Sequence, residues 1–378
     1  MIRPLTLDDV PDIPRLLATE QGPHAEPSPH LRAVIEKLLP KLFIDTPHAD
    51  PELPGLVSVA DDGQLTGMIG RITRQMELRG RPIRAAVACE LFVDPAHRSK
   101  MLGVKLLKQL MARPQDLLFS DIANETSRKI WTGLGGSIAS WYGLTWVKVL
   151  RPAQFALSML RDRRFGKLAW SGRPLAAVAD RVLGRFARRL TQLGPEPRAT
   201  SQPLTPELFL ELFPQFSAAD DLRPVYDRET LDWIWSRLDF MYSAGPSEQH
   251  LVTSPSGEPL GWYIIQMTET RVIRVSQIVA LPHTIGPVLD PFTDRNCLLR
   301  PRSTHTLIHS RDPKVLEAFA TGRAFLSLFE SEGPLQIWIK SPLALERIGR
   351  DNAVNSSADG ILVEQKQTSP VEHTRSLS

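Results

Sequence analysis

The sequence predicts an α/β protein in which sheet strands are flanked by helices and the arrangement occurs twice. Three observations support this class. Apolar β-forming runs at 86–93 and 272–281 are each followed by a proline, and a hairpin pattern precedes each run. The first run leads through a short loop into apolar positions at helical spacing from Leu102 onward. At 378 residues the chain is too long for one small core, so two domains are expected.

Composition restricts the class of protein further. The apolar fraction is 42% and the charged fraction is 23%, which are typical values for globular proteins. The sequence has no apolar run of about 18 residues and no basic and apolar leader, so we expect no membrane span. With only Cys89 and Cys297, we expect no disulfide framework and a cytoplasmic location. The net charge of +3 does not by itself imply a nucleic-acid partner, and none is expected.

The N-terminal part predicts a strand, two helices and a meander. Residues 1–17 give a short strand followed by a helix start with acidic residues in its first turn. A proline-rich loop at 21–30 precedes helical spacing over 31–39. Residues 55–70 and 75–81 have the pattern of antiparallel strands joined by a turn.

The loop between the first buried run and its helix predicts an anion site. A strand that enters a helix through Arg98-Ser99-Lys100-Met101-Leu102-Gly103 places two cations beside unpaired backbone N–H groups. The positive end of the helix dipole lies at the same point. A diphosphate would suit this combination. The alternative is an ordinary βαβ turn whose glycine only relieves a tight corner.

This stretch resembles motif A of the GNAT superfamily of acyl-CoA-dependent N-acyltransferases, whose loop has the pattern Arg/Gln-x-x-Gly-x-Gly/Ala. Arg98 matches the first position and Gly103 the second glycine, whereas Met101 stands where the first glycine is expected. Residues 117–136 resemble motif B of the same superfamily. The matching positions in that block are Asn124, Trp131 and Gly135.

The resemblance implies a mixed, mostly antiparallel twisted sheet flanked by helices, with acetyl-CoA or another acyl-CoA as cosubstrate. It implies that the strand at 91–93 pairs with the pantetheine arm, that 100–104 cradles the diphosphate and that Asn124 bonds the pantetheine. The residues expected at the cofactor are Leu91, Phe92, Val93, Arg98, Ser99, Lys100, Met101, Leu102, Gly103, Val104, Asn124, Ser127 and Trp131.

Glu90 is the one charge inside the first buried run, and the resemblance makes it the candidate general base. Period-two alternation predicts that it shares a face with Ala88 and Phe92. A structural carboxylate paired with an arginine is an equal alternative. Relatives commonly protonate the departing thiolate with a tyrosine where this chain has Trp131. An indole N–H cannot act as a general acid, so Tyr142 or water is the candidate replacement.

The predicted function is transfer of an acetyl or short acyl group from CoA to an amine. A catalytically silent acyl-CoA-binding or interaction protein is the alternative, and a FemAB-like aminoacyltransferase is a third hypothesis. The acceptor, a small molecule or an amino group of a peptide or protein, and the oligomeric state stay open. The resemblance implies that His24, Glu26 and His30 contact the acceptor. The alternative is that they belong to a solvated loop.

A first domain is expected over 1–150, followed by a basic helical linker over 151–198. The linker holds eleven lysines and arginines against three acidic residues, a local charge of +8, so the rest of the chain sums to −5 within the total of +3. Over 173–193 the pattern predicts a basic amphipathic helix, suited to an interdomain position or to an anionic membrane surface. One helical face is marked by Leu175, Val178, Val182, Phe186 and Leu190.

A second, degenerate copy of the fold is expected over 199–350, because the element order of the first half recurs there. Residues 283–292, which follow Pro282, contain neither the glycine pattern nor a lysine, so the copy should lack a phosphate loop. His305 and His309 are four residues apart, but they lie on a predicted strand without a third ligand, so no metal is expected. The polar residues 351–378 predict a disordered tail.

Overall fold

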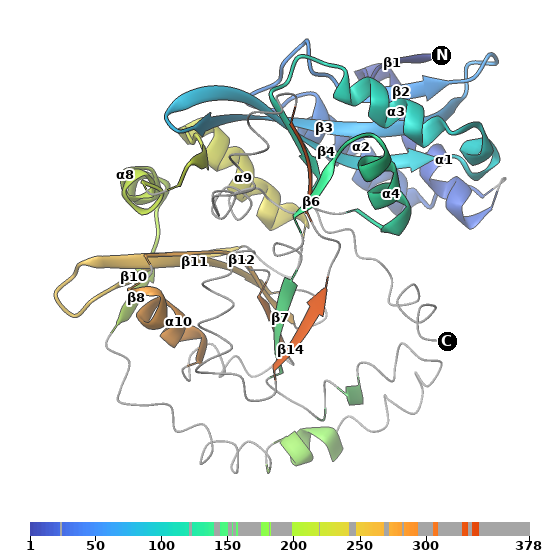
Figure 1. Ribbon diagram of the computed structural model, residues 1–378. Helices are drawn as coiled ribbons and strands as arrows, with labels where there is room; N and C mark the ends of the chain where they lie inside the picture. The colour runs from blue at the N-terminus through green and yellow to red at the C-terminus, as the bar shows by residue number, and fades with distance from the viewer. Residues whose placement is uncertain are drawn as a thin grey trace. The chain divides into compact units, whose positions relative to one another are not determined.

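The computed structural model describes most of the chain between Met1 and Ile339 (Figure 1). The described residues are 1–22, 25–120, 123–139, 144–149, 153, 156–157, 175–180, 182, 199–218, 220–241, 247–267, 272–281, 283–293, 305–308, 327–331 and 335–339. The predicted tail at 351–378 and His309 lie outside these residues.

The chain forms two compact units, each built on one sheet. The first unit combines 1–143 with 220–233 and the segment that contains β15. Its elements are β1 (Ile2–Pro4), α1 (Ile13–Ala18), α2 (Pro29–Phe43), β2 (Leu56–Val59), β3 (Leu65–Leu78), β4 (Arg81–Val93), α3 (Leu102–Met111), β5 (Leu117–Ser120), α4 (Glu125–Gly133), β6 (Ser137–Ala139), β9 (Leu222–Pro224) and β15 (Leu335–Ile339).

The second unit contains the other labelled elements, and the division between the units falls inside α9, after Trp233. These elements are β7 (Leu144–Val149), β8 (Thr200–Pro203), α8 (Pro206–Phe216), α9 (Arg228–Met241), β10 (Glu248–Thr253), β11 (Pro259–Met267), β12 (Val272–Ala280), α10 (Ile285–Thr293), β13 (His305–Ile308) and β14 (Ser327–Ser331).

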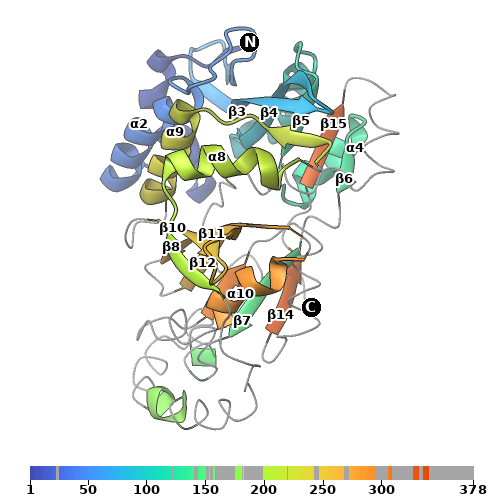
Figure 2. The ribbon, with the colours of Figure 1, turned by 90° about the vertical axis from the view of Figure 1, so that its left-hand side faces the viewer.

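The first sheet has the strand order β1-β2-β3-β4-β5-β15-β6, with β9 paired to β3 beside that path. The strands β4 and β5 are parallel, and the other pairs are antiparallel. Figure 2 shows β3, β4, β5 and β15 side by side. Helices cover this sheet, which confirms the predicted fold class of a mixed, mostly antiparallel sheet flanked by helices.

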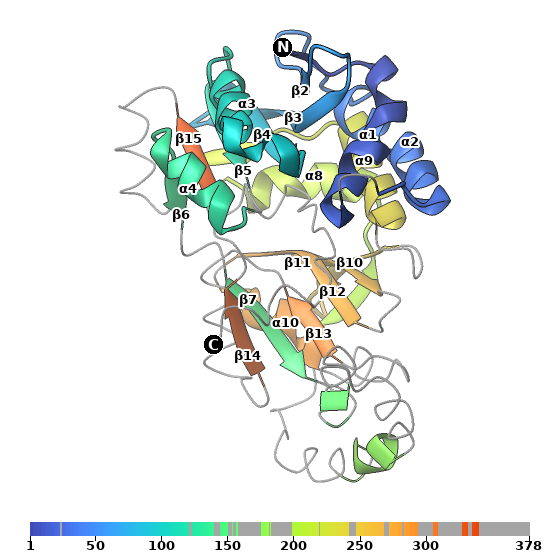
Figure 3. The ribbon, with the colours of Figure 1, turned by 90° about the vertical axis from the view of Figure 1, so that its right-hand side faces the viewer.

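The second sheet has the order β8-β10-β11-β12-β13-β7-β14, and only β12 and β13 are parallel (Figure 3). Read from β1 and from β8, the two sheet paths therefore show the same sequence of parallel and antiparallel neighbours. Besides β9, which pairs with β3, each sheet includes one strand that is separated in sequence from the strands beside it. The strand β7 follows β6 but pairs with β13 and β14, and β15 follows β14 but pairs with β5 and β6.

This exchange corrects the expected end of the first domain at residue 150. Residues 144–149 were expected to close the first domain, but they pair within the second sheet. Residues 335–339, expected in the second domain, pair within the first. Strands that follow one another in the sequence usually lie next to each other in space, so the sequence predicts that pairing. The strands β7 and β15 are exceptions to this tendency.

The helix α3 is held on the first sheet by a single apolar face. The residues predicted for that face from their spacing are the buried residues of the helix, Leu102, Leu106, Leu107, Leu110 and Met111. They pack with Ala86 and Ala88 of β4 in one hydrophobic cluster. Burial of one leucine side chain contributes roughly 1.5–3 kcal/mol, so this face fixes the position of the helix.

On the opposite face of the sheet, Phe43 of α2 lies so close to Gly70 of β3 that a Cβ there would come within 2.5 Å of its ring.

The C-terminal end of α3 is bound by a buried cation. The side chain of Arg71 on β3 is only 2% exposed, and its Nη2 donates to the carbonyl oxygen of Leu110 over 2.7 Å. The amide of Gln115 donates to the same oxygen over 3.1 Å. Burial, together with the neighbouring charge of Arg113, lowers the pKa of Arg71 to about 9. The helix dipole favours a cation at this end of α3. The Nε and Nη1 atoms of Arg71, however, have no hydrogen-bond partner in the structure.

Arg71→Met should leave the free energy of unfolding unchanged or increase it, measured by chemical denaturation near neutral pH. The substitution removes the desolvation cost of the charge and retains a long apolar side chain, while Gln115 continues to donate to the Leu110 carbonyl. Arg71→Ala is the comparison, because it leaves a cavity and should destabilise the chain by about 2 kcal/mol or more. A loss above about 1 kcal/mol in the methionine variant would show that the guanidinium stabilises α3.

Candidate functional site

The candidate site begins where β4 and β5 separate. The parallel ladder between them joins Ala85 to Leu117, Ala86 to Leu118 and Val87 to Phe119. Beyond Val87, β4 continues to Val93, whereas β5 ends at Ser120. In the described part of the chain, the last residues of β4 therefore lie beyond its ladder with β5. An extended ligand could bind along this part of β4 by backbone hydrogen bonds.

A β-bulge lies in the same part of β4. Phe92 pairs with Met68 and Cys89 pairs with Gly70, so between these pairs two residues of β4, Glu90 and Leu91, are matched against one residue of β3. Within the bulge, the backbone of Glu90 is left-handed, with a φ of 50°. Such a φ is unfavourable for a residue with a Cβ by roughly 1–2 kcal/mol. Bulges of this kind are concentrated beside active sites, where they redirect side chains.

The bulge overturns the predicted alternation along β4. Ala88 belongs to the cluster beneath α3, and Leu91 and Val93 pack against that same cluster. Since neighbours in a strand point to opposite faces, Phe92 points away from α3. Ala88 and Phe92 are thus on opposite faces, not on one face with Glu90 as expected. One extra residue shifts the register of the side chains, and a pattern with period two does not reveal it. The Glu90 side chain at the bulge is partly buried.

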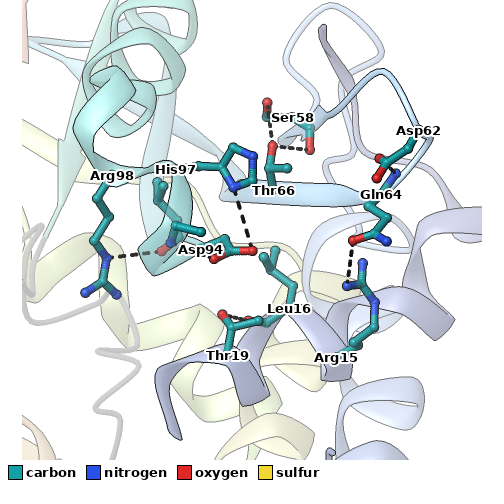
Figure 4. Close-up of polar contacts among 12 residues, drawn as sticks. Arg15, Leu16, Thr19, Ser58, Asp62, Gln64, Thr66, Asp94, His97 and Arg98 are labelled. Atoms are coloured by element: carbon teal, nitrogen blue, oxygen red, sulfur yellow. Dashed lines mark hydrogen bonds and ion pairs between the residues drawn. The ribbon is translucent and has the colours of Figure 1, made fainter. Parts of the chain in front are cut away.

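The loop after β4 turns sharply before it enters α3. Residues Pro95–Lys100 form a 3-10 turn, and the Asp94 side chain accepts a hydrogen bond from the backbone N–H of Ala96 over 2.9 Å. Figure 4 shows the His97 ring facing the Asp94 carboxylate, with 3.7 Å between Nδ1 and Oδ2. Met101 follows with φ 54° and ψ 32°, a left-handed conformation. This conformation explains why a glycine is expected at position 101 in the motif.

The start of α3 has the features of an anion site. Met101 makes no side-chain cap, and the backbone N–H of Lys105 donates to the Met101 carbonyl as a first helical turn requires. The backbone N–H groups of Leu102, Gly103 and Val104 precede this bond and point out of the helix end. Arg98, Ser99 and Lys100 are exposed beside them. The arrangement brings three donors and two cations together.

Gly103 lies between the end of β4 and α4. A Cβ on this glycine would make ordinary van der Waals contacts, at 3.7 Å from Val93 Cγ2, 3.8 Å from Ile130 Cδ1 and 4.0 Å from Leu91 Cδ2. Packing within the chain therefore does not demand a glycine, whereas close approach of a ligand to the backbone would. The sequence did not single out Ile130, although its place one residue before Trp131 on α4 is a usable signal.

Arg98 is held by the chain itself. Its Nε donates to the backbone carbonyl of Val93 over 3.2 Å (Figure 4), and its Nη2 forms an ion pair with the carboxylate of Glu20. Glu20 belongs to the 3-10 turn Thr19–Gln21, directly before the proline-rich loop. The guanidinium at the first motif position is thereby linked to the segment between α1 and α2.

The two expected cofactor residues at the start of α4 form its cap. Asn124 accepts a hydrogen bond through its side-chain oxygen from the backbone N–H of Ser127 over 2.8 Å. This cap uses the amide oxygen, which leaves the amide NH₂ group as the donor toward a ligand. Trp131 on the same helix is only 3% exposed and belongs to the hydrophobic cluster beneath α3. In this structure it is a packing residue.

Two of the four other candidate positions lie in the described part of the chain. Glu26 and His30 are exposed, at the loop before α2 and in its first turn. Tyr142 and His24 lie outside the described residues. Among the described residues, no cluster of three or more His, Cys, Asp or Glu side chains could hold a metal ion. Within the same part of the chain, no helix has the length and apolar character needed to cross a membrane.

Three solved structures resemble this chain over 90% of its length. A GCN5-related N-acetyltransferase from Anabaena variabilis superposes with a TM-score of 0.57 at 11% identity, covering 90% of this chain and 72% of its own. A probable N-acyltransferase from Enterococcus faecalis gives 0.53 at 11% identity, with coverage of 90% and 72%. A GCN5-related N-acetyltransferase from Kribbella flavida gives 0.51 at 14% identity, with coverage of 90% and 71%.

At the level of sequence, no family model matches this chain and no curated protein matches it either. The strand order, the parting of the parallel strands and these superpositions agree with one another. The chain has the fold of the GCN5-related N-acetyltransferases.

Proposed function

We propose that this chain transfers an acyl group, acetyl or another short acyl, from acyl-CoA to an amine. The observation that carries the proposal is the coincidence of three features at one place. The strand β4 runs past its ladder with β5, a bulge lies at Glu90, and the uncapped start of α3 follows with Arg98 and Lys100 beside it. A CoA thioester has an extended polar arm and a diphosphate, which suit these features in that order.

In this proposal the pantetheine arm lies along Leu91–Val93, and Asn124 donates to it through its amide NH₂ group. The diphosphate is bound by the backbone N–H groups at 102–104, with Lys100 and Arg98 as nearby cations. Attack of a neutral amine on the thioester carbon places negative charge on the carbonyl oxygen. A backbone N–H near Phe92 or Val93 is the proposed donor to that oxygen.

The amine must be neutral to attack, so a base has to remove its proton. Glu90 is the proposed base, directly or through a water, because it lies at the bulge next to the backbone assigned to the thioester. The proton taken from the amine leaves through the carboxylate, and the departing CoA thiolate needs a proton in turn. Tyr142 or water is the proposed donor, since an indole N–H such as that of Trp131 is not acidic enough.

A second candidate function is binding of acyl-CoA without turnover. The burial of Trp131 favours it, because the side chain that stands at the usual tyrosine position is 3% exposed within the core and offers no acidic proton. Turnover of acetyl-CoA, followed as free thiol released in the presence of a broad amine panel, separates the two functions. Acyl-CoA binding with no thiol release for any amine would support the silent protein.

We also propose that the second unit is a duplicated and degenerate copy of the first. Three features support the duplication besides the common strand order. In β12 an extra residue interrupts the pairing with β11 between Gln277 and Val275, as the bulge does in β4. Gly261 of β11 pairs with the last residue of β12, and Gly67 of β3 pairs with the last residue of β4.

The third feature is that each of these glycines lies close to the next helix of its unit, Gly67 to α3 and Gly261 to α10. A Cβ on Gly261 would come within 2.8 Å of Val288 on α10, and one on Gly67 within 3.2 Å of Leu106 on α3. The start of α10 differs from that of α3. There the hydroxyl of Thr284 accepts from the backbone N–H of Leu281 and donates to the Leu260 carbonyl, and the sequence between 281 and 290 has no lysine or arginine.

One acetyl-CoA should bind per chain, because, among the residues that the structure describes, cations beside an uncapped helix start are found at α3 of the first unit. Isothermal calorimetry with acetyl-CoA should give a stoichiometry near one. Gly103→Leu should weaken this binding by about tenfold or more, because a large side chain obstructs the backbone approach to the diphosphate.

Gly103→Ala is the matched control for folding, since its Cβ has room in the structure. A stoichiometry near two would contradict the degeneracy of the second unit. Unchanged affinity in a folded Gly103→Leu variant would show that the loop is not the binding site.

Glu20→Gln should raise the affinity for acetyl-CoA roughly two- to fivefold, the factor expected from the loss of an exposed competing ion pair. Glu20 pairs with Arg98 and so competes with the diphosphate for its guanidinium. Glu26→Gln is the control, because it removes the same charge from an exposed position nearby. Equal gains in both variants would mean that long-range charge alone acts. A loss of affinity in Glu20→Gln would instead make Glu20 the residue that holds Arg98 in place.

Glu90→Gln should reduce turnover by roughly 10²–10⁴ and leave acetyl-CoA affinity intact, because the amide keeps the size of the side chain but cannot accept the proton. Turnover per folded molecule and thermal stability are measured on the same variant. The pH–rate profile should also lose its acidic limb. A stable variant with full activity would exclude Glu90 from the mechanism, and a destabilised variant with full turnover would make it a structural carboxylate.

A further inference from the structure

A helix in the basic segment exposes its largest apolar side chains. The structure describes helical residues 175–180 and 182, called the linker helix below. Leu175 is 76% exposed, Val178 56% and Val182 50%. These residues follow the spacing i, i+3 and i+7, so they form one stripe along the helix.

The linker helix packs in the opposite sense to an ordinary surface helix. Its buried contact is made by a small residue, Ala176, which is 7% exposed. Asp180, one turn later, accepts a hydrogen bond from the backbone N–H of Ala153 over 2.8 Å through its side chain. The face with Ala176 and Asp180 is thus bound to the chain, and the aliphatic stripe points to solvent. Exposed apolar surface of this kind indicates a covering partner.

The surrounding sequence indicates the chemistry of that partner. Residues 151–198 carry a local charge of +8, while the rest of the chain sums to −5. A helix with an aliphatic stripe inside a strongly basic segment is the combination that lies at the interface of an anionic bilayer. At such an interface aliphatic side chains insert among the acyl chains, and a basic segment is attracted to the anionic headgroups.

A protein partner or a second copy fits these observations less well. A stable protein–protein interface buries about 800 Å² on each partner, and a stripe of three aliphatic side chains is only a small part of that area. A bilayer requires no matching shape and combines shallow insertion with long-range attraction. We propose that the linker helix binds anionic membrane surfaces, with Leu175, Val178 and Val182 inserted. This inference does not depend on the proposed transferase activity.

Sedimentation of the full-length chain with lipid vesicles tests the proposal. The chain should bind vesicles of phosphatidylserine and phosphatidylcholine in equal parts, and not vesicles of phosphatidylcholine alone. Raised salt should weaken the binding, because the attraction between exposed charges is screened. The triple variant L175S/V178S/V182S should lower the affinity for the mixed vesicles by about tenfold or more.

Ala177→Ser is the matched control, since Ala177 is exposed on the same helix outside the stripe. Circular dichroism checks that the variants fold, and Leu175→Ser alone replaces the triple variant if that one does not. Equal binding of the stripe variant and the control would overturn the proposal, as would equal binding to both kinds of vesicle. An oligomer that light scattering detects in the parent chain and not in the stripe variant would assign the stripe to self-association instead.

Discussion

The candidate site depends on one extra residue in β4. If β4 paired regularly with β3 through Glu90, Leu91 and Val93 would face away from α3 and the cluster around Gly103 would not form. The bulge allows the strand to leave its ladder with β5 and still keep apolar side chains beneath the helix. The left-handed backbone at Glu90 is the local cost, of roughly 1–2 kcal/mol, which the buried leucines of α3 offset.

Because of the strand exchange, each sheet is completed by a strand that is separated in sequence from the strands beside it. Without β15, the edges of β5 and β6 would be exposed to other chains, and without β7 the same holds for β13 and β14. Neither half of the sequence contains a complete sheet. The C-terminal half of the sequence is thus needed by the sheet that carries the proposed site, because it supplies β15, which pairs with β5 and β6.

Local features were predictable from the sequence, and features that depend on strand pairing were not. The buried face of α3 follows from helical spacing, and the turn after β4 follows from Asp94-Pro95. The exchange of β7 and β15 has no local signal, because any apolar strand can pair with any other. The bulge was missed for a related reason: alternation describes one strand alone, and a bulge is a relation between two. The orientation of the linker helix, which exposes Leu175, required the structure as well.

Met101 shows why a motif is better compared by conformation than by residue type. Glycine is expected at this position because the backbone is left-handed, and the methionine adopts that conformation with φ 54°. The surroundings impose it: the Asp94 side chain caps the preceding turn, the Met101 N–H donates to the Arg98 carbonyl, and the buried face of α3 fixes the helix start. Of the three described non-glycine residues with positive φ, Glu90 and Met101 lie at the candidate site and Arg79 in the turn between β3 and β4. Strain of about 1–3 kcal/mol persists where packing over-determines it, and it concentrates where a backbone must meet a ligand.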